Sequence, residues 1–213
     1  MLTLANTNLQ ISPLCLGGNV FGWTADVANS EAVLSYFVDK GGNFIDTADM
    51  YSEWGSGNVG GESETIIGNW LKKRGGRDSV VIATKVAKLS TRRGLSATNL
   101  QAACEDSLSR LQTDYIDLYY AHEDDPQTPL EETLGAFDSL MQSGKVLYIA
   151  ASTLRQNDSG NLWRSPKKMA LLLMTLLRIS STCWNVIMNG PCSPLYCRIL
   201  SVNCLTLAWQ EDS

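Results

Sequence analysis

Short apolar segments alternate with longer amphipathic ones along the first three quarters of the chain. The apolar segments have few polar interruptions, which is typical of parallel strands buried on both faces. Five such strands are expected: SPLCLGG (12–18), NFID (43–46), SVVIATKV (79–86), YIDLYYAH (115–122) and VLYIAAS (146–152). The opening residues 2–12 alternate about a central Asn-Thr-Asn and predict a small hairpin.

The amphipathic segments between these strands carry apolar residues at helical spacing. They predict four helices: NSEAVLSYFVDKGG (29–42), ESETIIGNWLKKRGG (62–76), SATNLQAACEDSLSRLQ (96–112) and PLEETLGAFDSLMQSGK (129–145). Asn29 or Ser30 is expected to cap the first helix and Ser96 the third, because these side chains accept hydrogen bonds from the first helical amides.

The regular order of strand and helix indicates an α/β protein with a parallel sheet. Two architectures fit this order: an open doubly wound sheet and a (β/α)8 barrel of the TIM type. The first turn after a strand reads GGNVFG, which is not a dinucleotide fingerprint leading directly into a helix. This favours the barrel, present here as about five βα units with an N-terminal hairpin that could cover its bottom.

The composition changes sharply near residue 155. Residues 1–160 hold 20 of the 22 acidic residues, whereas residues 161–213 hold four of the six cysteines and an excess of basic residues. The spacing of those cysteines matches no common zinc site. We therefore expect a partial barrel over residues 1–155 and an atypical, irregular tail over residues 156–213.

The overall charge and hydropathy narrow the class of protein. A net charge of −5 argues against binding to nucleic acid or to an anionic membrane. The longest strongly apolar run, residues 169–177, is too short to cross a bilayer, and the N-terminus has no signal-peptide pattern. A cytoplasmic protein is expected, while its oligomeric state stays open.

Ionisable and polar residues follow the ends of four predicted strands. Asp46 ends the second strand and Tyr51 lies in the loop after it, Lys85 ends the third, His122 the fourth and Ser152 the fifth. Each one alone is consistent with a solvated strand end or a satisfied polar side chain. In a barrel, however, all of these ends meet on the face where active sites form, so together they indicate a site.

Acid–base chemistry explains why these residue types would occur together. A tyrosine with a pKa near 10 is a poor acid or base at neutral pH, and an adjacent ammonium lowers that pKa. A buried lysine in turn needs a carboxylate to stay charged. Lys85 is therefore expected to lower the pKa of Tyr51, with Asp46 as the partner of Lys85, while a neutral His122 orients a carbonyl oxygen.

The segments FIDTADMY, VVIATKV, DYIDLYYAH and GKVLYIAAS resemble the aldo-keto reductase superfamily, and GGESETIIGNWLK is similar to its bacterial and potassium-channel-β-like branches. The resemblance implies a (β/α)8 barrel that binds a nicotinamide cofactor, usually NADPH, and reduces small-molecule carbonyl substrates, aldehydes or ketones. It implies a catalytic tetrad at Asp46, Tyr51, Lys85 and His122. The alternative function is that of a non-catalytic, nicotinamide-binding regulatory subunit of the channel-β type.

The resemblance also implies where the cofactor would be held. Asn19 and Val20 match cofactor-contacting positions after the first strand, Asp46 is also expected to contact the cofactor, and Ser152 matches a contact to the nicotinamide amide. At the next position the family usually has Asn, but this chain has Thr153, which lacks the paired donor and acceptor of an amide.

The tail departs from the family pattern, and the genetic code suggests a reason. Codons for residues 183–192, read from the third base of Cys183, permit Leu-Glu-Arg-Asn-Tyr-Glu-Arg-Ala-Leu, which resembles the family's segment after strand six. In the same frame, residues 206–212 permit Ser-Leu-Ala-Gly-Gly-Phe, which resembles a later family loop. We expect the chain to be read out of frame after about residue 155 and, as written, to be inactive or nearly so.

Overall fold

A small hairpin lies at the N-terminus of the computed structural model, which describes residues 1–4 and 7–153. Strands β1 (Leu2–Thr3) and β2 (Gln10–Ile11) pair antiparallel, as the alternation predicts. The Asn43 side chain, just before the second strand of the main sheet, accepts from the Ser12 amide at 2.6 Å and donates to the Gln10 carbonyl. These bonds fix the hairpin at the amino ends of the strands, the bottom of a barrel.

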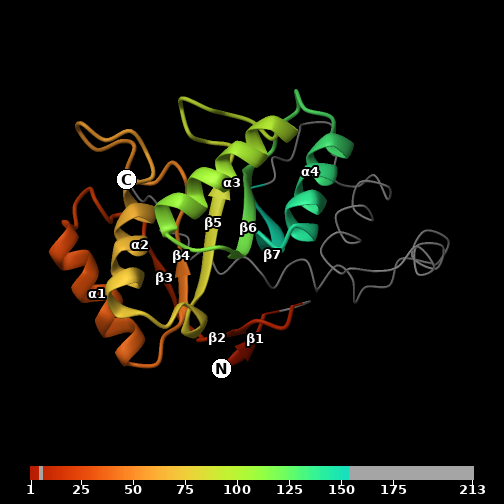
Figure 1. Cartoon of the computed structure of the whole chain (residues 1–213). Coiled ribbons are helices and arrows are strands. Elements are labelled where there is room, and N and C mark those ends of the chain that lie inside the picture. The colour runs from red at the N-terminus through yellow and green to blue at the C-terminus, as the bar shows by residue number, and fades with distance from the viewer. Residues whose placement is uncertain (5–6, 154–213) are drawn as a thin grey trace, which may run out of the picture.

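The main sheet is parallel, with its strands side by side in chain order. Its members are β3 (Cys15–Gly17), β4 (Phe44–Asp46), β5 (Val81–Val86), β6 (Ile116–Glu123) and β7 (Val146–Thr153). Gly17 pairs with Asp46, and Asp46 pairs with Ala83 on the next strand. The carboxyl ends of neighbouring strands therefore lie at one edge of the sheet, at the top in Figure 1.

Four helices lie on the same side of this sheet, one after each of the first four strands (Figure 1). They are α1 (Val27–Asp39), α2 (Glu62–Arg74), α3 (Ala97–Leu111) and α4 (Leu130–Gln142), with a short 3-10 helix η1 (Arg77–Ser79) before β5. The core lies between helices and sheet, where Ile67, Ile82, Leu100 and Tyr119 are fully buried. Helical crossovers of this kind cover one face of a parallel sheet, and in known proteins they are nearly always right-handed.

Helix starts follow the expected chemistry with one exception. The Ser96 hydroxyl caps α3 by accepting from the Asn99 amide, as predicted. The cap of α1 is neither Asn29 nor Ser30. The Asp26 carboxylate accepts from the Asn29 amide at 2.8 Å, and the helix begins at Val27. The prediction was wrong because the preceding loop closes on itself, with a hydrogen bond from the Gly22 amide to the Ala25 carbonyl, and leaves Asp26 at the helix entrance.

Helices α2 and α3 approach each other closely at a glycine. A Cβ atom on Gly68 would lie 2.1 Å from the Arg110 carbonyl oxygen and 2.8 Å from the Leu111 Cα. Only glycine permits this backbone-to-backbone contact. The contact brings α3 close enough for Arg110 to reach Glu64 on α2, with Nε 2.6 Å from the carboxylate oxygen.

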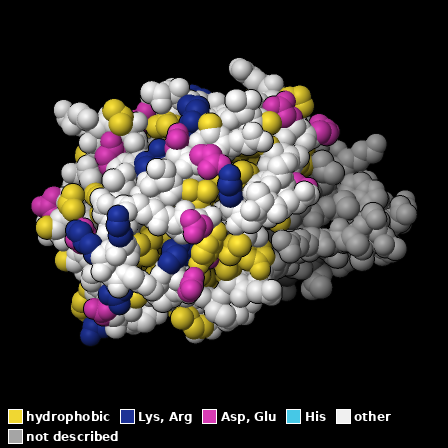
Figure 2. Space-filling view, in the orientation of Figure 1, with side chains coloured by type: hydrophobic (Ala, Val, Ile, Leu, Met, Phe, Trp, Pro, Cys, Tyr) yellow, Lys and Arg dark blue, Asp and Glu magenta, His cyan; other side chains and the backbone are white. Residues whose placement is uncertain are grey.

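The structure confirms the predicted α/β architecture, a partial barrel of five parallel strands and four helices within residues 1–4 and 7–153. Acidic and basic side chains are interspersed on the face shown in Figure 2. Across the described part of the chain, no helix combines the length and apolar character needed to cross a membrane. The predicted boundary near residue 155 and the tail fall outside the described residues and stay predictions.

Candidate active site

The parallel register brings the ends of β4 and β5 together with the loop that follows β4. Asp46 is the last residue of β4, and Lys85 lies near the end of β5. The Asp49 amide donates to the Lys85 carbonyl at 3.1 Å, so the chain after β4 continues along β5 before it turns. A tight turn, closed by the Tyr51 amide bonding to the Ala48 carbonyl, then directs Tyr51 back toward the strand ends.

The side chains of Asp46, Tyr51 and Lys85 form one hydrogen-bonded cluster. Lys85 Nζ donates to Asp46 Oδ2 at 2.6 Å, to the Tyr51 hydroxyl at 2.9 Å and to the Thr47 carbonyl at 2.8 Å. The Tyr51 hydroxyl donates to Asp46 Oδ2 at 3.2 Å. All three lysine protons therefore have acceptors, as a buried ammonium requires. The Lys85 side chain is only 7% exposed.

His122 lies on β6 beside this cluster. Its ring centroid is 6.0 Å from that of Tyr51, in an edge-to-face arrangement. Burial, together with the positive charges of Lys85 and Lys88, lowers the pKa of His122 to about 3. The imidazole is therefore neutral at physiological pH, as predicted. Its Nδ1 is buried and has no hydrogen-bond partner among the described residues.

The pKa of Tyr51 departs from the sequence-based expectation. Burial of the phenol and the negative charge of Asp46 raise this pKa above its ordinary value. The expectation took account of the lysine but not of the carboxylate, whose oxygen accepts from the phenol and opposes its ionisation. Lys85 also has a lowered pKa, because burial outweighs the favourable charge of Asp46. Tyr51 is thus held as a protonated phenol, the form that can donate a proton.

The residues expected to hold a cofactor fall around the same strand ends. Asn19 is exposed and Val20 half-buried in the turn after β3, and the Ser52 hydroxyl lies 3.5 Å from the Asn19 carbonyl oxygen. Ser152 is half-buried on β7, between the register pairs Ala121–Ala151 and Glu123–Thr153, and therefore lies beside His122. Thr153 is the last described residue of β7.

Two tryptophans extend the site outward, and no role was predicted for them from the sequence. The rings of Trp23 and Trp54 meet edge to face with centroids 5.8 Å apart, and the Trp54 ring lies 6.2 Å from that of Tyr51. The available signal was the position of each tryptophan, in the loops after the first and second strands of the sheet. Each loop opens onto the face where the predicted catalytic residues gather.

A buried acidic pair lies on the helix side of the sheet, behind the site. Asp49 is 1% exposed, and neither of its carboxylate oxygens makes a hydrogen bond of normal geometry to a described residue. Burial and the nearby Glu64 charge raise the pKa of Asp49 to about 7, outweighing Arg110, Arg92 and the Met50 amide. Glu64 itself accepts from Thr84 and Arg110.

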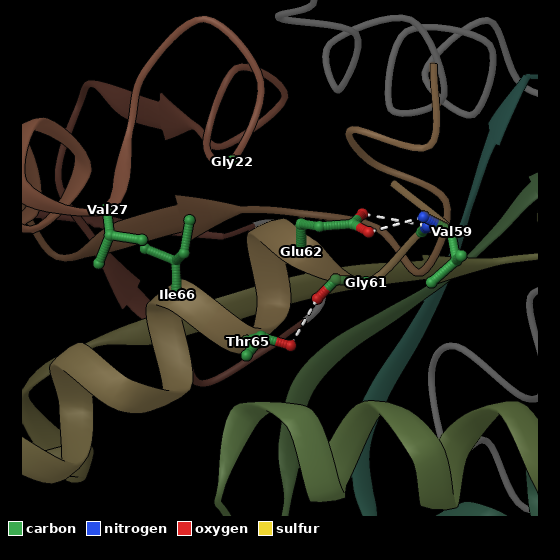
Figure 3. A pocket seen from close by; sticks show the side chains of 8 residues that line it. Gly22, Val27, Val59, Gly61, Glu62, Thr65 and Ile66 are labelled. Atoms are coloured by element: carbon green, nitrogen blue, oxygen red, sulfur yellow. Dashed lines mark hydrogen bonds between the residues drawn. The ribbon is translucent and has the colours of Figure 1, made fainter. Parts of the chain in front are cut away.

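A separate cavity of about 330 Å3 lies at the start of α2. Its lining comprises Gly22, Val27, Val59, Gly60, Gly61, Glu62, Thr65 and Ile66. Figure 3 shows the Glu62 carboxylate turned toward Val59. The backbone amides of Val59 and Gly60 donate to this carboxylate at 2.7 and 3.0 Å. None of the predicted catalytic residues lines this cavity, so it is distinct from the candidate active site.

A buried lysine paired with a half-buried aspartate, a tyrosine and a neutral histidine at the strand ends of a partial parallel barrel are typical of an enzyme site. Comparison with known proteins identifies the family. The sequence model of the Aldo/keto reductase family matches residues 13–169. The chain therefore belongs to the aldo/keto reductase family.

Individual relatives share substantial sequence identity. The uncharacterized oxidoreductase YrpG of Bacillus subtilis is 40% identical to this chain over 158 residues. The aligned region covers 70% of this chain and 48% of the YrpG sequence. Norsolorinic acid reductase of Aspergillus flavus is 36% identical, covering 70% and 41% respectively. An aryl-alcohol dehydrogenase of Pestalotiopsis microspora is 34% identical, covering 71% and 42%. The chain thus spans about half the length of the curated relatives it matches.

Proposed function

We propose that this site serves an NADPH-dependent oxidoreductase that reduces aldehydes or ketones to alcohols. One observation carries the proposal: Lys85 Nζ lies 2.9 Å from the hydroxyl of a Tyr51 that stays protonated. Such a phenol can give its proton to a carbonyl oxygen while the ammonium stabilises the resulting phenolate. Oxidoreductase, reductase and dehydrogenase are the words in the relatives' names, which supports the same reaction class.

The proposed chemistry divides between the protein and its cofactor. The nicotinamide, when bound, supplies the hydride that the carbonyl carbon accepts. Tyr51 gives its proton to the carbonyl oxygen, so the alcohol gains one hydrogen on carbon and one on oxygen. Neutral His122 has a single N–H with which to orient that oxygen. Asp46 favours the charged form of Lys85, which burial opposes.

The residues around the strand ends fit a nicotinamide. Ser152 lies beside His122, and its hydroxyl can both donate to and accept from a carboxamide. The exposed Asn19 stands at the opposite edge of the sheet, after β3. The buried Nδ1 of His122 lacks a partner among the described residues, as expected where a ligand meets this edge. NADPH rather than NADH is part of the proposal.

A non-catalytic regulatory subunit of the channel-β type is the competing function. It would need the cofactor-holding residues but not the proton donor. The complete hydrogen-bonded set of Asp46, Tyr51 and Lys85 favours the enzyme, because a binding protein has no need for a buried ammonium beside a phenol.

The test compares the 213-residue chain with the longer protein that the shifted frame would encode. NADPH absorbance is followed with aromatic and aliphatic aldehydes, and NADPH binding is measured by fluorescence. We expect turnover by the longer protein and its loss in Tyr51→Phe. Tight cofactor binding without turnover would favour the regulatory subunit. If the coding DNA shows no family-like continuation in that frame, the interpretation that the chain is read out of frame is wrong.

A further inference from the structure

Two buried polar side chains at the start of α2 face the sheet behind the candidate active site. Ser63 and Glu64 are the second and third residues of this helix, and both are fully buried. A buried carboxylate costs free energy unless it is paired and hydrogen-bonded. Arg110 supplies the ion pair with Glu64. The other side-chain hydrogen bonds of Ser63 and Glu64 go to residues at the strand ends.

The Ser63 hydroxyl connects α2 to the ends of β3 and β4. It accepts from the Thr47 hydroxyl and donates to the Gly18 carbonyl, both at 2.8 Å. The Gly18 amide in turn donates to the Asp46 carbonyl at 2.8 Å. A Cβ atom on Gly18 would lie 2.7 Å from Ser63 Oγ, so the helix and the strand end are in close contact. The Thr47 carbonyl accepts from Lys85 Nζ, so Thr47 alone connects Ser63 to the buried lysine.

The Glu64 carboxylate makes a second connection, to β5. It accepts from the hydroxyl of the fully buried Thr84 at 2.5 Å. Thr84 directly precedes Lys85, and successive side chains of a strand point to opposite faces. Thr84 therefore points toward the helices, while Lys85 points toward Asp46 and Tyr51. A shift of β5 that moved the lysine away from its partners would also break the bond between Thr84 and Glu64.

Net stability is a weak reason for this buried ion pair. Replacement of such a pair by apolar residues of the same volume is often neutral or stabilising. Fixed geometry is a stronger reason, because the bonds from Ser63 and from Glu64 both lead to Lys85. A displacement of about an ångström between reacting groups can lower a reaction rate roughly a hundredfold, even when its cause is remote from the chemistry.

We infer that Ser63 and Glu64 are positioning residues, which hold Lys85 within reach of the phenol and the carboxylate of the candidate site. They act through the hydroxyls of Thr47 and Thr84. The catalytic consequence of this role rests on the proposed reductase function, whereas the placement of Lys85 does not. The placement can therefore be tested without cofactor or turnover.

The experiment measures the reactivity of Lys85 in the 213-residue chain. Lysines are acylated briefly with an N-hydroxysuccinimide ester, and mass spectrometry gives the rate at Lys85 relative to the exposed Lys72. A buried amine reacts only when the local structure opens. We expect Thr84→Val to raise the relative rate about tenfold, because opening then breaks one buried hydrogen bond fewer. Ser63→Ala should act in the same direction, and Thr84→Ser, which keeps the hydroxyl, should leave the rate unchanged.

Thr133→Val is the matched control. The Thr133 side chain is buried, and its hydroxyl donates to the Leu95 carbonyl at 3.0 Å. This variant also loses one buried hydrogen bond, so its melting temperature should fall about as far as that of Thr84→Val. The relative rate at Lys85 should nevertheless keep its wild-type value.

His122 provides an independent signature, because its ring lies 6.0 Å from that of Tyr51 and senses the orientation of the phenol. Its imidazole NMR signals should shift in Thr84→Val and in Ser63→Ala. They should coincide with those of the wild type in Thr84→Ser and in Thr133→Val.

The outcomes separate the positioning role from general stability and from the proposed function. A wild-type Lys85 rate in both Thr84→Val and Ser63→Ala would overturn the inference. An equal rise in Thr133→Val would also overturn it, because the rate would then report overall stability. In the longer protein, Thr84→Val should lower kcat by about tenfold or more at unchanged NADPH affinity. Protection of Lys85 that depends on Thr84, without any carbonyl reduction, would reject the proposed function and support the positioning role.

Discussion

Lys85 Nζ lies 2.9 Å from the Tyr51 hydroxyl and 2.6 Å from Asp46 Oδ2, so one buried ammonium contacts both the phenol and a carboxylate. The carboxylate favours the charged form of the lysine, and at the same time it opposes ionisation of the tyrosine. In the proposed reaction the phenol consequently remains a donor until the carbonyl oxygen of the substrate takes its proton. The cluster suits reduction better than the reverse reaction, in which Tyr51 would have to start as a base.

Substitution at Tyr51 should separate proton donation from cofactor binding. In the longer protein that we propose to turn over NADPH, we expect Tyr51→Phe to lower kcat by about a hundredfold or more, the usual contribution of a general acid. Cofactor affinity should change little, because only the hydroxyl is lost. Lys85→Met should lower kcat similarly, whereas Lys72→Met, on the exposed side of α2, should not. A Tyr51→Phe enzyme with a normal rate would contradict the assigned role.

His122 offers a direct test of site electrostatics, because it is the only histidine in the chain. Its pKa of about 3 predicts that the imidazole NMR signals do not shift between roughly pH 5 and pH 8. The unfolded chain in urea provides the control and should titrate near 6.5. Because the folded pKa is the lower one, this group removes stability as the pH falls below about 6.5. Titration of the folded protein near 6.5 would show that the ring is solvated.

Gly68 and Gly135 form a matched pair for testing the packing of the helices. An Ala at position 68 would place its Cβ 2.1 Å from the Arg110 carbonyl, so α2 and α3 must separate. We expect Gly68→Ala to destabilise the protein by several kcal/mol, as overpacking at fixed backbone does. Gly135, exposed on α4, has nothing within 4 Å of the added Cβ. Gly135→Ala should stabilise by about 0.5–1 kcal/mol. Thermal melts of both variants, compared with the wild type, test these two opposite changes in stability.

The elements and the clustering of the site residues were predictable from local pattern. Apolar runs fix the strands, and a parallel sheet necessarily brings Asp46, Lys85 and His122 to one edge. The helix cap at Asp26 was not predictable, because Asn29 and Ser30 are equally good capping residues and the choice depends on the fold of the preceding loop. The spacing of helix and strand determines which residues meet, but not how that loop closes.

The electrostatics of the site were only half predictable for a related reason. Residue types alone indicate that a lysine should lower the pKa of a tyrosine. The sign of the net effect depends on burial and on where the Asp46 oxygen lies, and both are tertiary quantities. The exposed tryptophan pair was missed because each ring belongs to a different loop. Their contact exists only once Asn58 and Ser52 join the two loops.

The buried carboxyl of Asp49 should make stability fall as the pH rises. Its pKa is about 7 in the folded protein and near 4 in the unfolded chain, so the folded state binds more protons between these values. The stability from the neutral carboxyl is complete below about pH 4 and is lost as the pH rises toward 7. Asp49→Asn stays neutral at every pH, so the melting temperature of this variant should rise relative to wild type between about pH 5 and pH 8. By linkage the difference amounts to a few kcal/mol.

Asp138→Asn, exposed on α4, is the control and should show no such trend. If Asp49→Asn and the wild type melt in parallel across this range, the carboxyl at position 49 is ionised in the folded protein, and Arg110 outweighs both burial and Glu64.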